Sequence, residues 1–183
     1  MHPDWHQVKR LLLVSLLEQD GVLNRILPLI QSRLPQVDIT MLGEFSQTFL
    51  QEWSDRSPDE PFSTLDLLSL PFPFSNPADQ ANRLIEVLKG RSFDAAIVFT
   101  LPGQSPYLIA YCCYLSGISI RVGQSCEFGG GVLSHCVKPP VDPVDVLESQ
   151  LHLLRSIGLL VEEANPASDL PPHTIQPLNF AGT

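Results

Sequence analysis

Positively charged residues are scarce in this sequence. Its 183 residues include 11 lysines and arginines against 20 aspartates and glutamates, so the formal net charge is -9 at pH 7. A protein that binds nucleic acid needs a clustered cationic surface, and we therefore expect no nucleic-acid partner. The start of the chain also lacks the basic residues and the apolar stretch of a secretory signal. We expect a cytoplasmic protein.

Long hydrophobic runs are missing as well. Residues 95–120 carry no charge, but the segment Leu-Pro-Gly-Gln-Ser-Pro at 101–106 divides them. Each piece is too short to cross about 30 Å of hydrocarbon. The sequence therefore predicts a strand, a loop and a buried helix in this region, and no transmembrane segment.

The motifs of common catalytic and cofactor sites are absent. The sequence has no Gly-x-Ser-x-Gly nucleophile motif, and its glycine run at 129–131 lacks the Lys-Ser/Thr continuation of a phosphate-binding loop. The first apolar run is not followed by the glycine-rich fingerprint of a nicotinamide-binding protein. We therefore interpret the glycine run as a flexible loop and expect no cofactor.

Cysteine is present without a metal-binding pattern. The four cysteines include no Cys-x-x-Cys pair, and free thiols are the expected state. Zinc ligands could be drawn from Cys126, His135 and Cys136, but adjacent ligands at 135 and 136 are unusual and no second pair completes the coordination. We therefore expect no metal site. The other two cysteines are Cys112 and Cys113.

The sequence does contain a regular alternation of short apolar runs with segments of helical periodicity. Continuous apolar runs favour strands buried on both faces of a parallel sheet. Apolar residues three and four positions apart, with a capping residue or proline at the start and glycine at the end, predict helices. The expected strands are 10–17, 37–42, 65–70, 93–99 and 118–122, and the expected helices are 22–33, 43–53, 77–90, 106–117 and 142–158.

This alternation predicts an α/β fold, a Rossmann-like parallel sheet of five or more strands with helices on both faces, in a single domain. We assign residues 1–8 to an N-terminal extension, residues 9–160 to the domain and residues 161–183 to a proline-rich tail or linker. In the last predicted helix, the residues expected to face inward are Val144, Leu147, Leu151 and Leu154.

Residues that follow a strand are candidates for a functional site, because ligands of open parallel sheets bind outside the carboxyl ends of the strands. Asp20 follows the first predicted strand. It is placed to act as a general base or to cap the next helix, and its position alone favours the cap. Arg121 lies at the fifth strand, where it would meet an anionic acceptor or cap the sheet edge, and the sequence leaves both open.

Several segments of the sequence, taken together in their order and spacing, resemble those of a known protein family. They are Arg-Leu-Leu-Leu-Val-Ser-Leu at 10–16, Asp-Gly-Val-Leu at 20–23, Val-Asp-Ile-Thr-Met-Leu at 37–42, Ser-Phe-Asp-Ala-Ala-Ile-Val at 92–98, Ile-Ser-Ile-Arg-Val-Gly at 118–123, Leu-Ser-His-Cys-Val at 133–137 and the final helix at 150–159. Together they resemble the N-terminal, acceptor-side domain of the family 9 glycosyltransferases, the heptosyltransferase-like enzymes of the GT-B fold. The similarity covers about residues 9–160.

The resemblance implies the transfer of a sugar from a nucleotide-activated donor to a saccharide hydroxyl, in the synthesis of lipopolysaccharide or another cell-envelope glycan. Asp20 would take the proton of the acceptor hydroxyl. The residues implied to hold the saccharide are Gly21, Asn24, Gln104, Ser105 and Arg121.

A GT-B enzyme binds its donor on a second Rossmann-like domain, and 183 residues leave no room for one. The resemblance therefore implies a chain that is inactive alone and that works with a donor-binding domain or subunit. The alternative is a non-catalytic binding or regulatory relic of the same fold.

Overall fold

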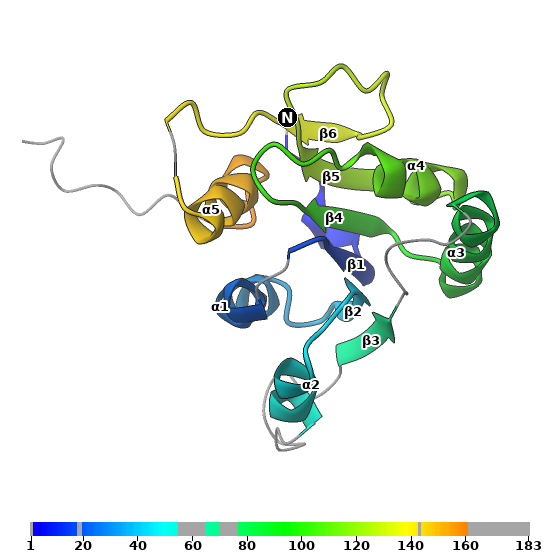
Figure 1. Ribbon diagram of the computed structural model, residues 1–183, viewed down its shortest axis with the longest axis horizontal. Coiled ribbons are helices and arrows are strands. Elements are labelled where there is room, and N and C mark those ends of the chain that lie inside the picture. Colours follow the sequence, from blue (N-terminus) through cyan, green and yellow to red (C-terminus); the bar gives the residue numbers. More distant parts are fainter. Residues whose placement is uncertain (1, 18–19, 55–64, 70–76, 143, 161–183) are drawn as a thin grey trace, which may run out of the picture.

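A computed structural model describes residues 2–17, 20–54, 65–69, 77–142 and 144–160 (Figure 1). Strands and helices alternate along the chain, after a short 3-10 helix, η1 (Trp5–Gln7). The strands are β1 (Arg10–Ser15), β2 (Asp38–Gly43), β3 (Leu65–Ser69), β4 (Ala95–Phe99), β5 (Ile120–Gln124) and β6 (His135–Val137). The helices are α1 (Asp20–Arg33), α2 (Gln47–Ser54), α3 (Pro77–Arg91), α4 (Tyr107–Leu115) and α5 (Val146–Ser156).

The six described strands form one parallel sheet in the order β3-β2-β1-β4-β5-β6. At its centre β1 pairs with β4, so that Leu13 lies beside Ile97. Residues 11–14 of β1 and all of β4 have no exposed surface. Their continuous apolar sequence is what a strand covered on both faces requires. The predicted parallel sheet of five or more strands, with these two runs inside it, is confirmed.

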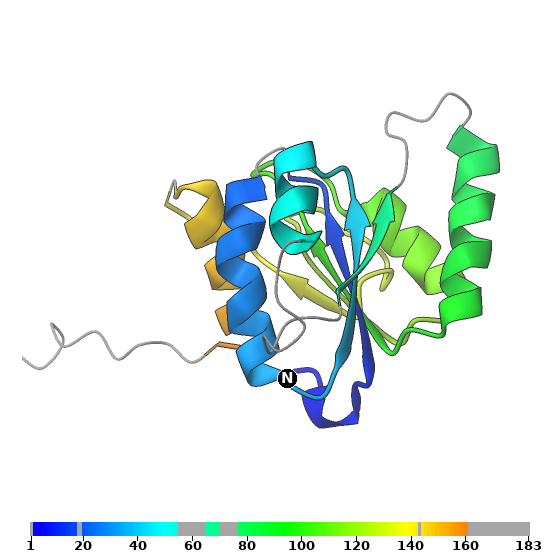
Figure 2. The ribbon, with the colours of Figure 1, turned by 90° about the horizontal axis from the view of Figure 1, so that it is seen from below.

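Helices cover both faces of the sheet. Because side chains alternate along a strand, Leu11 and Leu13 of β1 point to one face, and Leu12 and Val14 point to the other. The first pair packs in one apolar cluster with α1 and α5, and the second pair packs in another with α3 and α4. Figure 2 shows this division, with α1, α2 and α5 on one side of the sheet and α3 and α4 on the other.

The residues that precede β1 pack against the rest of the domain. Trp5 donates a hydrogen bond from its Nε1 to the carbonyl oxygen of Ile157, at 2.8 Å, and Val8 is buried in the same cluster as α1 and α5.

At the amino ends of the central strands, the carboxylate of Asp94 accepts hydrogen bonds from the backbone nitrogens of Lys9, at 2.8 Å, and Arg10, at 2.9 Å. This carboxylate ties β1 to the entry of β4.

Two elements near the carboxyl end of the domain differ from the prediction. The strand β6 lies outside the strands that the sequence predicts, and it pairs with β5. The helix α5 begins later than expected because Asp145, rather than Asp142, caps it: its carboxylate accepts a hydrogen bond from the Glu148 nitrogen at 2.7 Å. Val144 therefore precedes the helix and is 36% exposed instead of facing inward.

The helix α4 is buried on one face rather than all round. Four of its residues are buried, whereas Leu108 is 57% exposed and Tyr111 and Leu115 are exposed beside it. The sequence could not show this, because the helix is apolar on every side. Within the described ranges, no helix combines the length and the apolar character needed to cross a bilayer. The predicted tail at 161–183 lies outside the described residues.

Candidate functional site

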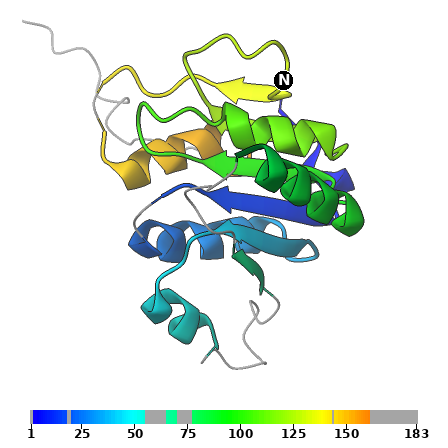
Figure 3. The same ribbon diagram turned by 45° about the vertical axis from the view of Figure 1, so that its right-hand side comes forward.

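The strand order sends the connections of the neighbouring strands β1 and β4 to opposite faces of the sheet. The chain passes from β1 through α1 to β2 on one side, and from β4 through α4 to β5 on the other. In Figure 3 the strands point to the same edge of the molecule, where the connections leave them. Ligands of such sheets bind at the carboxyl ends of the strands, where the connections of two neighbouring strands leave in opposite directions. The residues that follow β1, β4 and β5 are therefore the ones to inspect.

A pocket of about 120 Å³ opens at this edge. It is lined by residues 100–105, which follow β4, by residues 124–127 at the end of β5, and by Pro139. Gln104 and Ser105, both predicted to hold a saccharide, are thus brought together here. Of the described residues that line the pocket, Glu127 alone carries a charge.

A small hydrogen-bond network fixes Glu127 in this pocket. Ser105 donates from its Oγ to Oε2 of the Glu127 carboxylate, at 2.8 Å. The backbone nitrogen of Glu127 donates to the Oγ of Ser125, at 3.0 Å, and the hydroxyl of Tyr107 donates to the Glu127 carbonyl oxygen, at 2.9 Å. Burial raises the pKa of Tyr107, which keeps that hydroxyl protonated and able to donate.

The Tyr107 contact explains part of the glycine run. A Cβ on Gly129 would lie 1.8 Å from Cε1 of the Tyr107 ring, far inside van der Waals contact. Gly130 and Gly131 have φ angles of 56° and 82°, in the left-handed region that glycine adopts without strain. The run therefore shapes the loop around Tyr107 and supports the position of Glu127.

Gln104 closes the turn that follows β4. Its side-chain Oε1 accepts a hydrogen bond from the Leu101 nitrogen, and its backbone nitrogen donates to the Leu101 carbonyl oxygen, both at 3.0 Å. Since the amide oxygen is used in this way, the amide NH2 group is what Gln104 offers a ligand.

Two buried glutamines hold the pocket against α5. Gln124 donates from Nε2 to the Ser149 carbonyl oxygen, at 2.8 Å, and accepts from the Ser149 hydroxyl, at 2.9 Å. Gln150 donates from Nε2 to the Thr100 carbonyl oxygen, at 3.0 Å. The end of β5 and the residue that follows β4 are thereby anchored to the same helix, behind the pocket.

Asp20, Gly21 and Asn24 lie in the first turns of α1, which begins at Asp20. The helix follows β1, the neighbour of β4 in the sheet, so its amino end belongs to the same carboxyl edge as the pocket. Gly21 is exposed, and a Cβ there would meet no atom within 4 Å. The side chain of Asp20 lies outside the described residues, so its assignment as base or cap stays a prediction.

Arg121 lies apart from the pocket, in the amino-terminal half of β5. Its guanidinium donates to the carbonyl oxygens of Val132, at 2.6 Å, and Ser119, at 2.9 Å, and to those of Ile118 and Gly131. Its Cζ lies 5.1 Å from the centre of the Tyr114 ring. Burial lowers its pKa. These contacts match the sheet-capping interpretation, and they leave the guanidinium turned away from the predicted saccharide site.

Sequence reasoning missed Glu127 as a site residue. Two of its partners, Ser105 and Tyr107, stand 22 and 20 positions away in the chain, so the group forms no local motif. Among the described residues, no three His, Cys, Asp or Glu side chains gather as a metal site. All four cysteines are free.

Comparison with known proteins shows that the chain shares its fold with a protein of known structure. No protein-family model and no curated protein sequence matches the chain. A solved structure, the glycosyl transferase family 9 from Veillonella parvula DSM 2008, is similar to it with a TM-score of 0.58 and 14% sequence identity. The similarity covers 84% of this chain and 42% of that one, so this chain spans less than half the length of its structural neighbour. The α/β fold is that of a parallel sheet with helices, consistent with half of a GT-B structure.

Proposed function

We propose that this chain is the acceptor-binding half of a family 9-type glycosyltransferase. In the complete reaction, a saccharide hydroxyl bound by this chain would attack the anomeric carbon of a nucleotide-activated sugar. The new glycosidic bond forms at that carbon, its bond to the nucleotide phosphate oxygen breaks, and the nucleotide leaves with the electron pair. A second, donor-binding domain or subunit would hold the nucleotide sugar.

The observation that supports this proposal is the pocket at the carboxyl ends of β4 and β5. It offers a fixed carboxylate from Glu127, a hydroxyl from Ser105 and amide hydrogens from Gln104. Carboxylates and amides form hydrogen bonds with the hydroxyl groups of a sugar, which both donate and accept. Because the described lining includes a carboxylate and no cation, the part of the acceptor that binds here is a neutral polyol rather than an anionic group.

Asp20 is the proposed base of this reaction. It stands at the amino end of α1, beside the strand that neighbours β4. The acceptor hydroxyl would give its proton to the Asp20 carboxylate as the oxygen attacks. Gly21 and Asn24, in the same turns of α1, would line the acceptor path, whereas Arg121 is assigned to the structure of the β5 to β6 connection.

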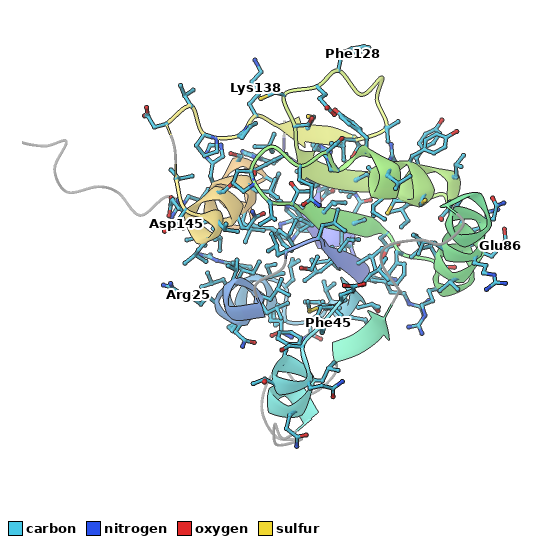
Figure 4. The ribbon with its side chains drawn as sticks, viewed as in Figure 1. Arg25, Phe45, Glu86, Phe128, Lys138 and Asp145 are labelled. Atoms are coloured by element: carbon cyan, nitrogen blue, oxygen red, sulfur yellow. The ribbon has the colours of Figure 1, made fainter. Side chains whose placement is uncertain are left out.

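Saccharide binding by the isolated chain tests the proposed site. Affinities for a panel of neutral oligosaccharides would be measured by ligand-observed NMR for the native chain and for Glu127→Gln and Ser105→Ala. Each change should weaken binding by about 5-fold to 30-fold, or about 1 to 2 kcal/mol. Ser105→Ala removes a hydrogen-bonding hydroxyl, and Glu127→Gln replaces charge-assisted hydrogen bonds by weaker neutral ones. Glu86→Gln is the matched control, since Glu86 lies on α3, away from the pocket (Figure 4). Equal affinities in all four proteins would contradict the assignment of the pocket.

The variant Asp20→Asn distinguishes the proposed role of Asp20 as a base from its role as a helix cap. An asparagine also accepts hydrogen bonds from helix amides, so the free energy of unfolding should stay within about 0.5 kcal/mol. Since the amide cannot take a proton, turnover in the presence of the donor-binding unit should fall by about 100-fold or more. Unchanged turnover would leave Asp20 with the capping role only.

A further inference from the structure

A second and larger cavity lies on another side of the domain, at the free edge of the described sheet. It has a volume of about 640 Å³, is open to solvent, and is lined by β6, by the segment that follows it, by α5 and by Pro3. It meets the carboxyl-edge pocket only at Pro139, which lines both. A volume in this range accommodates a small organic ligand.

The charge of this cavity is opposite to that of the whole chain. The chain carries a net charge of -9, yet no acidic residue is found among the described residues that line the cavity. Its polar side chains are instead His135, Lys138 and His152, with the hydroxyls of Ser134 and Ser156. Lys138 directly follows β6 and is labelled in Figure 4. The described lining therefore offers one ammonium group, two imidazoles and two hydroxyls, on an acidic protein.

The hydrogen bonds of His135 determine which of its ring nitrogens can titrate. The Ser134 Oγ accepts from the Arg121 nitrogen, at 2.7 Å, and donates its single hydrogen to the Arg121 carbonyl oxygen, at 3.1 Å. Nδ1 of His135, 2.9 Å from that Oγ, must therefore supply the hydrogen of their contact. This leaves Nε2 of His135 as the atom that gains or loses a proton.

The same reasoning applies to His152 on α5. Its Nε2 lies 3.1 Å from the Lys138 carbonyl oxygen, which can only accept, so Nε2 carries a hydrogen. Nδ1 is then the ring nitrogen that carries no hydrogen in the neutral imidazole. Each imidazole thus has one nitrogen committed to the protein as a donor, and each becomes a cation when its other nitrogen is protonated.

The groups around His135 favour its neutral form while the cavity is empty. Burial lowers the pKa of His135, and the positive charges near it, including Arg121 from β5 and His2 from the N-terminal segment, lower it further. Near His152 on its own helix, Arg155 pairs with Glu148 at 2.5 Å. An anion bound in the cavity would stabilise the protonated form of the imidazoles. Its binding would therefore be coupled to the uptake of a proton.

We propose that this cavity binds a small organic molecule through a phosphate or sulfate group, with Lys138 and the protonated imidazoles of His135 and His152 as its partners. The tetrahedral oxyanion has several acceptor oxygens for these donors. The apolar lining, which includes Val137, Pro140 and Ile157, would pack against the organic part. Binding at this site is independent of the saccharide pocket.

Sulfate probes test the proposal cleanly, because sulfate keeps its charge across the pH range in which histidine titrates. Binding of phenyl sulfate and of inorganic sulfate to the full chain would be measured by calorimetry at pH 5.5 and pH 8.0. Phenyl sulfate should bind about tenfold or more tightly at pH 5.5, with proton uptake visible as a dependence of the heat on the buffer. Inorganic sulfate should bind more weakly, since it lacks the apolar part. Failure of phenyl sulfate to bind at about 10 mM at the lower pH would overturn the proposal.

Three variants assign the binding to this cavity. His135→Asn keeps a donor in the place of Nδ1, and His152→Gln keeps one in the place of Nε2, so both preserve the contacts to the protein and remove the titration. Each should reduce the ratio of the affinities at the two pH values by about threefold or more, and Lys138→Gln should weaken binding at both. The controls are His6→Gln and Lys89→Gln, which make the same changes of residue type outside the cavity lining. If the control variants lowered the affinity as much as the cavity variants, the site would be elsewhere and the proposal wrong.

Discussion

Gly129 is the residue at which the backbone and the candidate site are most closely linked. With a Cβ only 1.8 Å from the Tyr107 ring, alanine at this position would force the ring aside and break the hydrogen bond from Tyr107 to Glu127. Gly129→Ala should therefore lower the free energy of unfolding by about 1 to 3 kcal/mol and weaken saccharide binding as well. Urea denaturation measures the first effect.

Gly21→Ala is the natural control for that experiment. A Cβ on Gly21 has open space around it, and alanine is the better residue in a helix. The change should leave the stability of the fold unchanged or raise it by up to about 1 kcal/mol. If Gly129→Ala were as stable as Gly21→Ala, Tyr107 would not be held against the glycine loop as described.

The four cysteines should divide into two reactive and two unreactive thiols. Burial raises the pKa of Cys113 to about 12, so at pH 8 only about one in ten thousand of its thiols is ionised, and burial raises the pKa of Cys112 too. Cys126 and Cys136 are exposed. Brief alkylation at pH 8 followed by peptide mass spectrometry should label only the exposed pair, and labelling of Cys113 at the same rate without denaturant would contradict its burial.

At the scale of elements, the central strands carry the stability of the fold. Ile97 of β4 is fully buried and pairs with Leu13 on one side and Val122 on the other. Ile97→Ala should lower the free energy of unfolding by about 2 to 5 kcal/mol, because it leaves a cavity between the sheet and the helices α1 and α5 that pack on it. Val87→Ala on α3, at a residue that is 44% exposed, should cost less than about 1 kcal/mol. Chemical denaturation of the two variants would show the contrast, and similar losses in both would refute the central position of β4.

These same elements show how far the sequence predicts the fold. The strands β1 and β4 could be predicted from the sequence. Both of their faces are covered, and this requires an unbroken apolar run. The strand β6 could not, since three residues at an edge leave no periodicity to detect. The start of α5 was misplaced because Asp142 and Asp145 are both good capping residues, and only the contact to the Glu148 nitrogen decides between them.

The candidate site was predictable in part for a similar reason. Gln104 and Ser105 follow a strand that the sequence reveals, so their place at the carboxyl edge could be predicted. Glu127 follows the next strand, but its role depends on meeting Ser105 and Tyr107 in space, which no local pattern encodes. Arg121 was a candidate only by its charge, and the carbonyl oxygens that surround it belong to loops whose course the sequence does not specify.

At the scale of the whole molecule, we propose a chain that holds an acceptor and leaves the donor to another unit. The rival view, a binding or regulatory relic, shares the same fold and differs in chemistry. Both require a ligand at the carboxyl ends of β4 and β5, and only the first requires that a donor-binding unit restore sugar transfer. Occupation of this pocket by a saccharide is therefore the central claim.

The most direct test of that claim is a residue-resolved NMR titration of the isolated chain with the tightest-binding neutral oligosaccharide. Saturable shifts of backbone amides should gather at residues 100–105 and 124–127, with smaller shifts in the first turn of α1. The amides of α3, which includes the control position Glu86, should not move. Shifts confined to any other part of the described chain, or no saturable shift at millimolar saccharide, would contradict the account.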